Sequence, residues 1–214
     1  MAYHEHTCGL PESVTALWHY TPESRTPGLI LPDGAIDLLF PEGEAPFMVG
    51  AMTEAKITAM NTSCTGIRLS PGGASALGNR DWSLFTDAHI SLKEAGFDFV
   101  TPRHALTQLV SGRIDATVKA ASALLANGTP VEQVAKETGY SRRHLERRFK
   151  HATGLGPKTF SRIMRFRRAL SYRHDALGAV EAGYYDQSHL HREFQRFAGM
   201  GPHQLVAFFQ DTGA

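Results

Sequence analysis

The hydrophobic pattern changes midway along the chain, from short apolar runs to longer amphipathic segments. Between positions 14 and 67, apolar stretches alternate with turn residues, as where Leu29–Leu31 is followed by Pro32-Asp33-Gly34. Proline fixes φ and glycine accepts positive φ, so Pro-Asp-Gly between apolar runs predicts a turn between two strands. Further strands are predicted at Ile36–Phe40, Phe47–Val49, Lys56–Met60 and Gly66–Ser70. The first half is therefore predicted to be a compact antiparallel sheet or small barrel.

The second half has the spacing of helices throughout. Pro102–Val110 predicts a helix that ends at Ser111-Gly112, and Asp115 can cap the next one. The segment Thr129-Pro130-Val131-Glu132 combines an N-cap threonine with proline and glutamate in the first turn, which predicts another helix start. From Pro157 a longer helix is expected to act as a rigid spacer, with one apolar side made by Phe160, Ile163, Phe166 and Leu170.

One fourteen-residue pattern occurs twice, at His144–Pro157 and at His189–Pro202. Both copies read H-L-x-R-x-F-x-x-x-x-G-x-G-P, at an offset of 45 residues. Ahead of each copy a small residue is followed four positions later by glycine, at Ala135 and Gly139 and again at Ala179 and Gly183. A short helix, a glycine turn and a basic second helix predict a helix-turn-helix, whose second helix fits the major groove of DNA.

A charged helical hairpin with a solvated face is the ordinary interpretation of one such copy. Two copies that end in the same Gly-x-Gly-Pro favour DNA binding instead. In the first copy Leu145 and Phe149 lie four residues apart, so they share the buried face of the helix and turn the basic residues outward. Ser141 is expected to cap this helix.

Charge is divided between the two halves. Residues 1–112 carry a net charge of −6 and residues 113–214 a net charge of +7, although the whole chain is at only +1. A basic half attracts phosphate, whereas an acidic half is repelled by DNA and suits another task. We therefore expect a regulatory, sensor-type or dimerisation domain at residues 1–112 and a DNA-binding domain at residues 113–214, which together make an α+β protein.

Composition argues against a membrane protein, a secreted protein and a cysteine metal site. The chain has no apolar run of the roughly 20 residues that a membrane helix needs, and its first residues lack the pattern of a signal peptide. A cytoplasmic, nucleoid-associated protein without membrane contact is expected. Cys8 and Cys64 have no metal-ligand spacing, so they are expected to be reduced, and no metal or cofactor is predicted.

The motifs resemble those of the AraC/XylS family of bacterial transcription regulators. The resemblance covers about residues 113–207 and depends on A-x-x-x-G-Y-S-R-R-H-L-E-R-R-F at Ala135–Phe149, on G-x-G-P-K at Gly154–Lys158, and on G-Y-Y-D-Q-S-H-L-x-R-E-F at Gly183–Phe194. It implies seven helices, with two helix-turn-helix units joined by a long helix. The first half is similar to a sensor-type domain found ahead of such units, through Pro32–Asp37 and Gly66–Ala74.

The resemblance also implies which residues read DNA. The base-edge readers would be Arg143, Glu146 and Arg147 in the first unit, and Gln187, Ser188, His191 and Arg192 in the second. Arginine can bind guanine, glutamine adenine, and glutamate cytosine through groove-edge hydrogen bonds. The residues expected at phosphates, which fix position without reading sequence, are Arg142, Lys150 and Arg196.

The role of the first half stays open between several alternatives. Arg68, Asp33 and Asp37 are candidate ligand-binding residues, and a small acidic effector at Arg68 and Pro71-Gly72-Gly73 is one form of this hypothesis. The half could instead serve only for dimerisation. A small metal- or anion-dependent enzyme is the rival class, with His4-Glu5-His6 as metal ligands or the two aspartates as a catalytic pair, but the first motif is more typical of a flexible terminus. Expected partners are double-stranded DNA, RNA polymerase, a small-molecule effector and a second copy of the chain.

The second unit departs from the first in the helix ahead of its turn. The first unit offers Pro130–Thr138 with two core valines, whereas the second offers only Ala176–Ala182, capped by Asp175 and interrupted by Gly178. Glycine inside a helix costs about 1 kcal/mol relative to alanine, and a missing buried valine costs roughly 1.5 to 3 kcal/mol more. The second unit is therefore expected to be the looser one.

Overall fold

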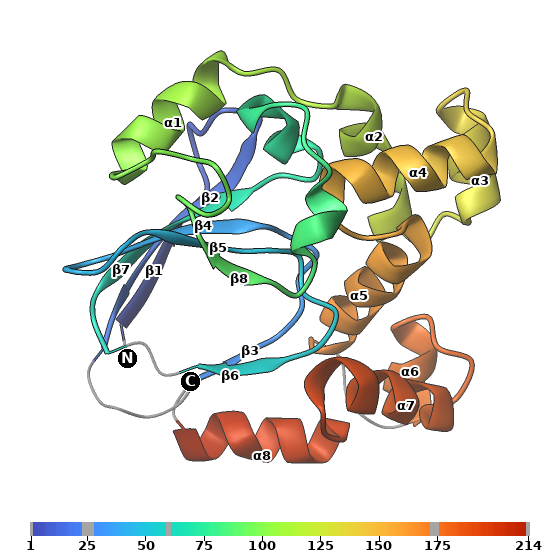
Figure 1. The fold of residues 1–214 in the computed structure, drawn as a ribbon. Coiled ribbons are helices and arrows are strands. Elements are labelled where there is room, and N and C mark those ends of the chain that lie inside the picture. The colour runs from blue at the N-terminus through green and yellow to red at the C-terminus, as the bar shows by residue number, and fades with distance from the viewer. Residues whose placement is uncertain (1, 23–27, 59–60, 172–175, 213–214) are drawn as a thin grey trace.

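The fold is an antiparallel sheet followed by a helical half (Figure 1). The computed structural model describes residues 2–22, 28–58, 61–171 and 176–212. Six strands form one sheet in the order β1-β2-β7-β4-β5-β8, with every neighbouring pair antiparallel. Their bounds are β1 Ala2–His6, β2 Val14–Thr21, β7 Cys64–Leu69, β4 Asp37–Pro41, β5 Phe47–Val49 and β8 His89–Ser91. Strands β3 (Gly28–Ile30) and β6 (Lys56–Thr58) pair separately as a two-stranded arm. The predicted antiparallel sheet is confirmed.

The two faces of the sheet carry different side chains because successive residues of a strand point to opposite sides. Leu38, Met48 and Ile67 are fully buried on one face, in a core that continues into the helical half. Trp18 and Leu39 belong to a smaller cluster on the other face. This second face looks toward the β3–β6 arm, so a space lined by strands on both sides is available there.

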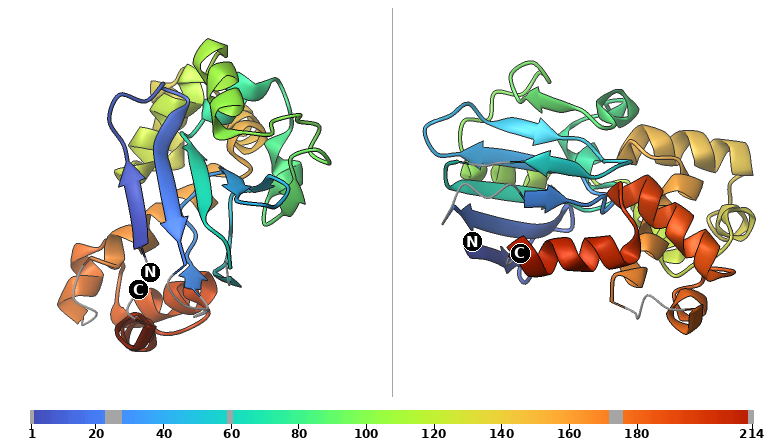
Figure 2. Two further views of the ribbon diagram at one scale, coloured as in Figure 1. Left: turned by 90° about the vertical axis from the view of Figure 1, so that its left-hand side faces the viewer. Right: turned by 90° about the horizontal axis from the view of Figure 1, so that it is seen from below.

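The helices follow the sheet in chain order. Two short 3-10 helices, η1 (Gly73–Leu77) and η2 (Trp82–Phe85), precede the α-helices. The α-helices are α1 Pro102–Ser111, α2 Ala116–Ala126, α3 Val131–Glu137, α4 Arg142–Thr153, α5 Pro157–Ala169, α6 Ala176–Glu181, α7 Gln187–Ala198 and α8 Pro202–Thr212. The views agree that α5 lies between the pair α3 and α4 and the pair α6 and α7 (Figures 1 and 2). Among the residues described, no helix is long and apolar enough to cross a membrane.

Helix caps agree with the sequence at two of three expected places. The Asp115 carboxylate accepts a hydrogen bond from the Val118 amide at 3.0 Å, and the Ser141 hydroxyl accepts one from His144 at 3.3 Å. The expected Thr129 cap is wrong. Pro130 is the N-cap residue of α3, and the Thr129 amide instead donates to the Leu124 carbonyl, so it closes the end of the preceding helix.

The N-terminal segment is a second correction. The motif His4-Glu5-His6 was expected to be a flexible terminus, yet it lies in β1 and pairs with β2. Its register places Glu5 opposite Trp18 and Tyr3 opposite Tyr20. The alternation of the strand therefore separates Tyr3 and Glu5, on one face, from the two histidines on the other.

Helix α5 supplies core residues to both helix-turn-helix units. Phe160, Ile163 and Phe166 are buried as predicted, while Leu170 is half-buried at the C-cap. Two edge-to-face aromatic pairs extend from this apolar side. Phe160 meets Phe149 of α4 at a centroid distance of 5.3 Å, and Phe166 meets Phe194 of α7 at 5.0 Å. Helix α5 thus holds α4 and α7, the second helix of each unit, in place, as expected of a spacer. We call α4 and α7 the recognition helices.

Each recognition helix is also fixed by one arginine-carboxylate pair. In the first unit Arg148 of α4 makes two hydrogen bonds to Asp115, of 2.8 and 3.0 Å, and a third to the hydroxyl of Tyr140. In the second unit Glu193 of α7 accepts two hydrogen bonds from Arg162 of α5. The Glu193 side chain is only 5% exposed, so this second pair is the more deeply buried one.

The two halves pack against each other at close range. The Thr86 hydroxyl, just after η2, donates a 2.6 Å hydrogen bond to the carbonyl of Gly154 at the end of α4. Gly34 has φ +76°, and a Cβ built there would lie 2.9 Å from the Phe160 ring of α5. The turn at Pro32-Asp33-Gly34 therefore lies directly on the spacer helix. The division into domains at residues 112 and 113 stays a prediction.

Substitution of Arg162 by methionine should lower the free energy of unfolding by about 3 kcal/mol, because removal of one partner leaves Glu193 charged and buried. The double change Arg162→Met with Glu193→Met should recover most of this loss, and urea unfolding measures both. Arg148→Met is the control. Its side chain is 37% exposed, so its loss should be smaller, about 1 kcal/mol. Equal losses in the two single variants, or no recovery in the double variant, would contradict the assignment.

Candidate functional site

The first recognition helix, α4, has one buried and one exposed side. Leu145 and Phe149 are fully buried, as the repeat predicts, and Arg143 and Arg147 are exposed on the outer side. The repeated histidine has a structural role in this unit. His144 stacks on Tyr140 in the turn, with ring centroids 4.7 Å apart and nearly parallel planes.

Two of the expected DNA contacts are paired with each other in the free protein. The Arg142 guanidinium donates a 2.9 Å hydrogen bond to Glu146 and a second one to Glu132 of α3. A contact of Arg142 with a phosphate, or of Glu146 with a base, would compete with this pair or use the donors and the carboxylate oxygen that it leaves free. Both side chains of the Arg142–Glu146 pair are about half exposed, so exchange costs little. Lys150, on the same helix, is exposed.

The second recognition helix, α7, brings its expected readers together. The Asp186 carboxylate caps the helix by accepting a 2.6 Å hydrogen bond from the His189 amide. One shallow hollow on the surface is lined by the four expected readers, Gln187, Ser188, His191 and Arg192. Arg196 is also exposed, one turn further along the helix.

Four other arginines around these helices have structural partners. Arg148 and Arg162 form the two ion pairs described above. Arg168 donates a hydrogen bond to the Ala126 carbonyl at the end of α2, and the Arg165 guanidinium lies over the Tyr184 ring at 5.6 Å. The basic residues of α4 and α7 left exposed to solvent are Arg142, Arg143, Arg147, Lys150, Arg192 and Arg196. Sequence alone does not separate these two groups of basic residues.

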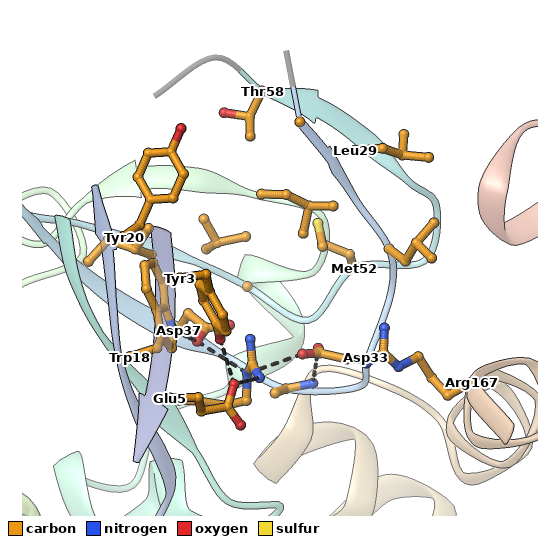
Figure 3. A pocket seen from close by; sticks show the side chains of 18 residues that line it. Tyr3, Glu5, Trp18, Tyr20, Leu29, Asp33, Asp37, Met52, Thr58 and Arg167 are labelled. Carbon is orange, nitrogen blue, oxygen red and sulfur yellow. Dashed lines mark hydrogen bonds and ion pairs between the residues drawn. The ribbon is translucent and has the colours of Figure 1, made fainter. Parts of the chain in front are cut away.

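A pocket of about 390 Å³ lies between the second face of the sheet and the β3–β6 arm (Figure 3). This volume is in the range of small-molecule sites. Its walls are mainly apolar and aromatic, with Trp18, Tyr20 and Leu39 from the sheet and Leu29 and Met52 from the other side. The spacer helix contributes one residue to the lining, Arg167.

Three carboxylates surround one arginine in this pocket. The Nε atom of Arg68 is 3.2 Å from Asp33 and 3.4 Å from Asp37, and its Nη1 atom is 3.3 Å from Glu5. Trp18 donates a 2.9 Å hydrogen bond from its indole nitrogen to Asp37, and the hydroxyl of Tyr3 donates to Glu5. Figure 3 shows these side chains converging at one end of the pocket. We call Glu5, Asp33, Asp37 and Arg68 the acidic cluster.

The structure brings together all three candidate ligand residues of the first half, Asp33, Asp37 and Arg68. The sequence did not indicate Tyr3 and Trp18, and it offered Glu5 only as part of the His4-Glu5-His6 metal hypothesis. The alternation in β1 could have placed Tyr3 and Glu5 on one face, had the terminus been read as a strand. The position of Trp18 depends on Gly66, because a Cβ there would lie 1.9 Å from the indole ring. The Asp33 carboxylate also accepts a 3.0 Å hydrogen bond from the Ala35 amide, as expected for a Pro-Asp-Gly turn.

The hypothesis of a small acidic effector at Arg68 and Pro71-Gly72-Gly73 does not agree with this geometry. Arg68 is surrounded by carboxylates, which disfavours the binding of an anion to it. The turn at Pro71-Gly72-Gly73 is filled by the chain itself, since a Cβ at Gly73 would lie 2.2 Å from the Ser13 carbonyl and one at Gly72 would lie 2.7 Å from that of Asp115. Over the described ranges, no group of three His, Cys, Asp or Glu side chains is arranged to hold a metal ion.

Burial changes the acid-base properties of the acidic cluster. The pKa of Asp37 is raised to about 6, mainly because burial disfavours its charged form and also because Asp33 lies nearby. The positive charge of Arg68 and the hydrogen bond from Trp18 lower the pKa of Asp37, but less than burial raises it. The pKa of Tyr3 is raised by burial and by its hydrogen bond to Glu5. Asp37 therefore changes charge close to physiological pH.

Comparison with known proteins matches each half separately. Residues 134–207 match a family described as a helix-turn-helix domain, and residues 8–91 match a domain of unknown function, DUF6597. None of the curated proteins matches the chain in sequence. These two ranges leave the segment between them unassigned, so they do not locate the domain boundary.

Several solved structures are similar to parts or all of the chain. The DNA-binding domain of the transcriptional factor AdpA, in complex with a target DNA, is 28% identical at a TM-score of 0.38, and the match covers 44% of this chain and 90% of that one. ToxT from Vibrio cholerae is 10% identical at a TM-score of 0.43, covering 96% and 93%. A fatty-acid-bound form of ToxT is 10% identical at 0.45, covering 100% and 92%.

Substitution of Asp37 by asparagine should change how stability depends on pH. The folded-state pKa of about 6 lies above the ordinary value of 3.8, so the stability that Asp37 contributes is fully present below pH 4 and is lost as the pH rises through 6. A shift of this size corresponds to at most about 3 kcal/mol. Asparagine stays neutral, so the free energy of unfolding of the variant minus that of the wild type should increase between pH 4 and 7. Urea unfolding measures it, and parallel pH profiles would contradict the prediction.

Proposed function

We propose, from the matches to a helix-turn-helix family and to DUF6597, that the chain is a sequence-specific transcription regulator of the AraC type with two adjacent major-groove contacts. Its N-terminal domain senses a small molecule. The observation that carries the DNA-binding part is the division of the arginines. Arg148, Arg162, Arg165 and Arg168 are partly buried and contact carboxylates, a carbonyl or a ring within the helical half. By contrast, Arg143, Arg147 and Arg192 on the outer faces of α4 and α7 are exposed and have no hydrogen bond or ion pair within the described residues.

Both recognition helices are proposed to contact base edges of DNA. Arg143, Glu146 and Arg147 read base edges from α4, and Gln187, Ser188, His191 and Arg192 read them from α7. Arg142, Lys150 and Arg196 contact phosphates and set the register. Because both helices pack on α5, their relative orientation is fixed by one rigid element, which suits two successive segments of the major groove.

Sensing is supported by the position of the pocket. Asp33 lines the pocket and is followed by Gly34, whose backbone lies on Phe160 of α5. Arg167 of the same helix reaches the edge of the pocket beside Asp33 (Figure 3). A ligand in the pocket thus touches residues that are in contact with the element carrying both recognition helices. We propose that ligand binding changes DNA affinity through this contact.

Selection of bound fragments from genomic DNA, followed by footprinting, tests the DNA-binding part and gives the operator directly. Fluorescence anisotropy then compares the selected duplex with random duplex at several salt concentrations. Tight, selective binding that weakens steeply with salt is expected, because phosphate contacts release counterions. Equal affinity for selected and random duplexes at every salt concentration would overturn the proposal.

Arg143→Ala and Arg147→Ala should each reduce discrimination at particular base pairs by about 1 to 3 kcal/mol, whereas Arg142→Ala should weaken binding to all sequences alike. The reason is that the two exposed arginines face outward from α4 beside its N-terminal turn. Competition assays on operators with single base changes measure the difference. Arg103→Ala, an exposed arginine on α1, is the matched control and should leave binding unchanged. Uniform weakening by Arg143→Ala and Arg147→Ala would instead assign both arginines to phosphates.

The second unit should be less protected from hydrogen exchange than the first when DNA is absent. Val134 of α3 is fully buried, but the equivalent position of α6, counted from the turn glycine, is Gly178, and Val180 is 59% exposed. The lengths differ less than expected, with seven residues in α3 and six in α6. The expected cap Asp175 lies outside the described residues.

Amides 176–182 are therefore expected to exchange faster than amides 131–137 in the free protein, because fewer apolar contacts resist local opening. Addition of operator DNA should narrow the difference. Mass spectrometry of exchanged peptides measures both conditions in one protein, so each unit serves as a control for the other. Equal protection of the two segments without DNA would show that the second unit is not the looser one.

A further inference from the structure

The charge of the pocket points to the kind of ligand that it binds. Glu5, Asp33 and Asp37 face a single guanidinium, that of Arg68, within 3.2 to 3.4 Å. The cluster thus has two more negative than positive charges when all its groups are ionised. Arg167 at the rim is exposed and forms no ion pair in the described part of the chain. Even with Arg167 included, the charged groups of the pocket that the structure describes keep one net negative charge.

Two carboxylate oxygens are left as hydrogen-bond acceptors. The Oδ1 atom of Asp37 accepts a hydrogen bond from Trp18 and forms an ion pair with Arg68. The Oε2 atom of Glu5 accepts a hydrogen bond from Tyr3 and also forms an ion pair with Arg68. Within the described residues, Asp37 Oδ2 and Glu5 Oε1 have no hydrogen-bond partner. Asp37 Oδ2 is not among the fully buried atoms left unpaired, and Glu5 is an exposed residue that lines the pocket. Both carboxylates therefore have an oxygen available to a donor in the pocket. Ionised carboxylates accept hydrogen bonds and donate none, so they suit an N–H donor that carries a positive charge.

The walls of the pocket suit the remainder of such a ligand. The rings of Tyr3 and Trp18 lie 5.9 Å apart beside the acidic cluster, and Tyr20 continues this aromatic wall. Aromatic faces attract cations and pack well against apolar groups. The opposite wall, from Leu29 to Leu31 and Met52, is mainly aliphatic and also includes Thr58 of β6. A charged head at the acidic cluster and an apolar body along the arm would fill the space.

We propose that the pocket binds an organic ammonium ion, a primary amine in its protonated form with an apolar or aromatic body. This inference rests on the proposed sensing function of the same pocket and names its ligand class. The ammonium group donates to Asp37 and Glu5 and balances the one negative charge that remains in the pocket when Arg167 is counted. The body packs on Trp18 and the β3–β6 arm. An anionic ligand would add charge to a cluster that is already negative, and a neutral one would leave that charge unpaired.

Isothermal titration calorimetry with three matched compounds tests the proposal on the full chain. The compounds are 3-phenylpropan-1-amine, 3-phenylpropan-1-ol and 3-phenylpropanoate, which share the aromatic body and differ in the charge of the head. The amine should bind at least about tenfold more tightly than the alcohol, and the carboxylate should bind no better than the alcohol. Binding of the carboxylate or alcohol as tightly as the amine would overturn the proposal, and so would failure of the amine to bind at millimolar concentration.

Two variants locate the head group. Glu5→Gln and Asp37→Asn should each weaken amine binding by about tenfold or more, while the affinity for the alcohol stays the same. Glu42→Gln makes the same charge change on an exposed residue that does not line the pocket, and it should leave both affinities unchanged. Because Glu5 lies on the edge strand β1, its substitution tests the site even if Asp37→Asn affects folding. Unchanged amine binding in Glu5→Gln and in a folded Asp37→Asn would overturn the assignment.

The pH dependence of amine binding gives an independent measurement. Protonation of Asp37, whose pKa is about 6, removes one negative charge from the head-group site. The groups that face this carboxyl are Glu5, Asp33, Arg68, Trp18 and Tyr3. Amine affinity should therefore fall between pH 7 and pH 5 in the wild type and stay nearly constant in Asp37→Asn. Equal pH profiles in the two proteins would contradict the proposal.

DNA binding separates failure of this inference from failure of the proposed function. The Glu42→Gln control lies outside the pocket and both recognition helices, so its affinity for operator DNA without amine should equal that of the wild type in the anisotropy assay. If operator binding is selective but the amine does not bind, the proposed ligand class is wrong and the proposed regulator function is supported. If the amine binds but no duplex is selected, the proposed ligand class is supported and the proposed regulator function is wrong.

Discussion

The buried side of α5 is the constraint on which the other parts of the molecule depend. Phe160 packs on α4, Phe166 packs on α7, and the same helix receives the turn at Gly34 from the sheet. Large aromatic side chains contribute a great deal of buried apolar area, and protein interiors at this density do not deform continuously. A displacement of α5 therefore has to be shared by both recognition helices and by the turn that borders the pocket.

The two units reach the same geometry with opposite charges at one position of the repeat. Arg148 in α4 and Glu193 in α7 are equivalent, since they lie 45 residues apart, and each forms a two-bond ion pair with the helix behind it. The partner is Asp115 in one case and Arg162 in the other. The two copies thus place an ion pair at the same position of the repeat but exchange the positive and negative partners. This is possible because either member of an ion pair can lie on the recognition helix. For this reason the charge of a recognition helix cannot be assigned to DNA by counting its basic residues.

The sequence predicts most of the architecture and only part of the pocket. The strands around Pro32-Asp33-Gly34, the caps at Asp115 and Ser141 and the apolar side of α5 are local or periodic features, so spacing is enough to find them. The pocket depends on register instead. Trp18 can lie over β7 only because Gly66 opposes it, and Glu5 reaches Arg68 only because β1 pairs at the sheet edge. No local pattern in the sequence specifies which strands become neighbours, and the error over the N-terminal segment has this cause.

The position of the negative charge explains how an acidic half can sit beside a DNA-binding half. Glu5, Asp33 and Asp37 are gathered around Arg68 on the face of the sheet that looks toward the arm, whereas α4 and α7 carry their exposed arginines on the helical half. Exposed charges more than about 10 Å apart are largely screened at moderate salt. Under the proposed sensing function, a ligand at the cluster would therefore change DNA affinity through structure more than through its electric field. That structural route is the contact of Gly34 with Phe160, one residue from Asp33. Coupling between two sites is reciprocal in free energy, so whatever change in DNA affinity a ligand causes at Asp33, DNA causes in the affinity for that ligand.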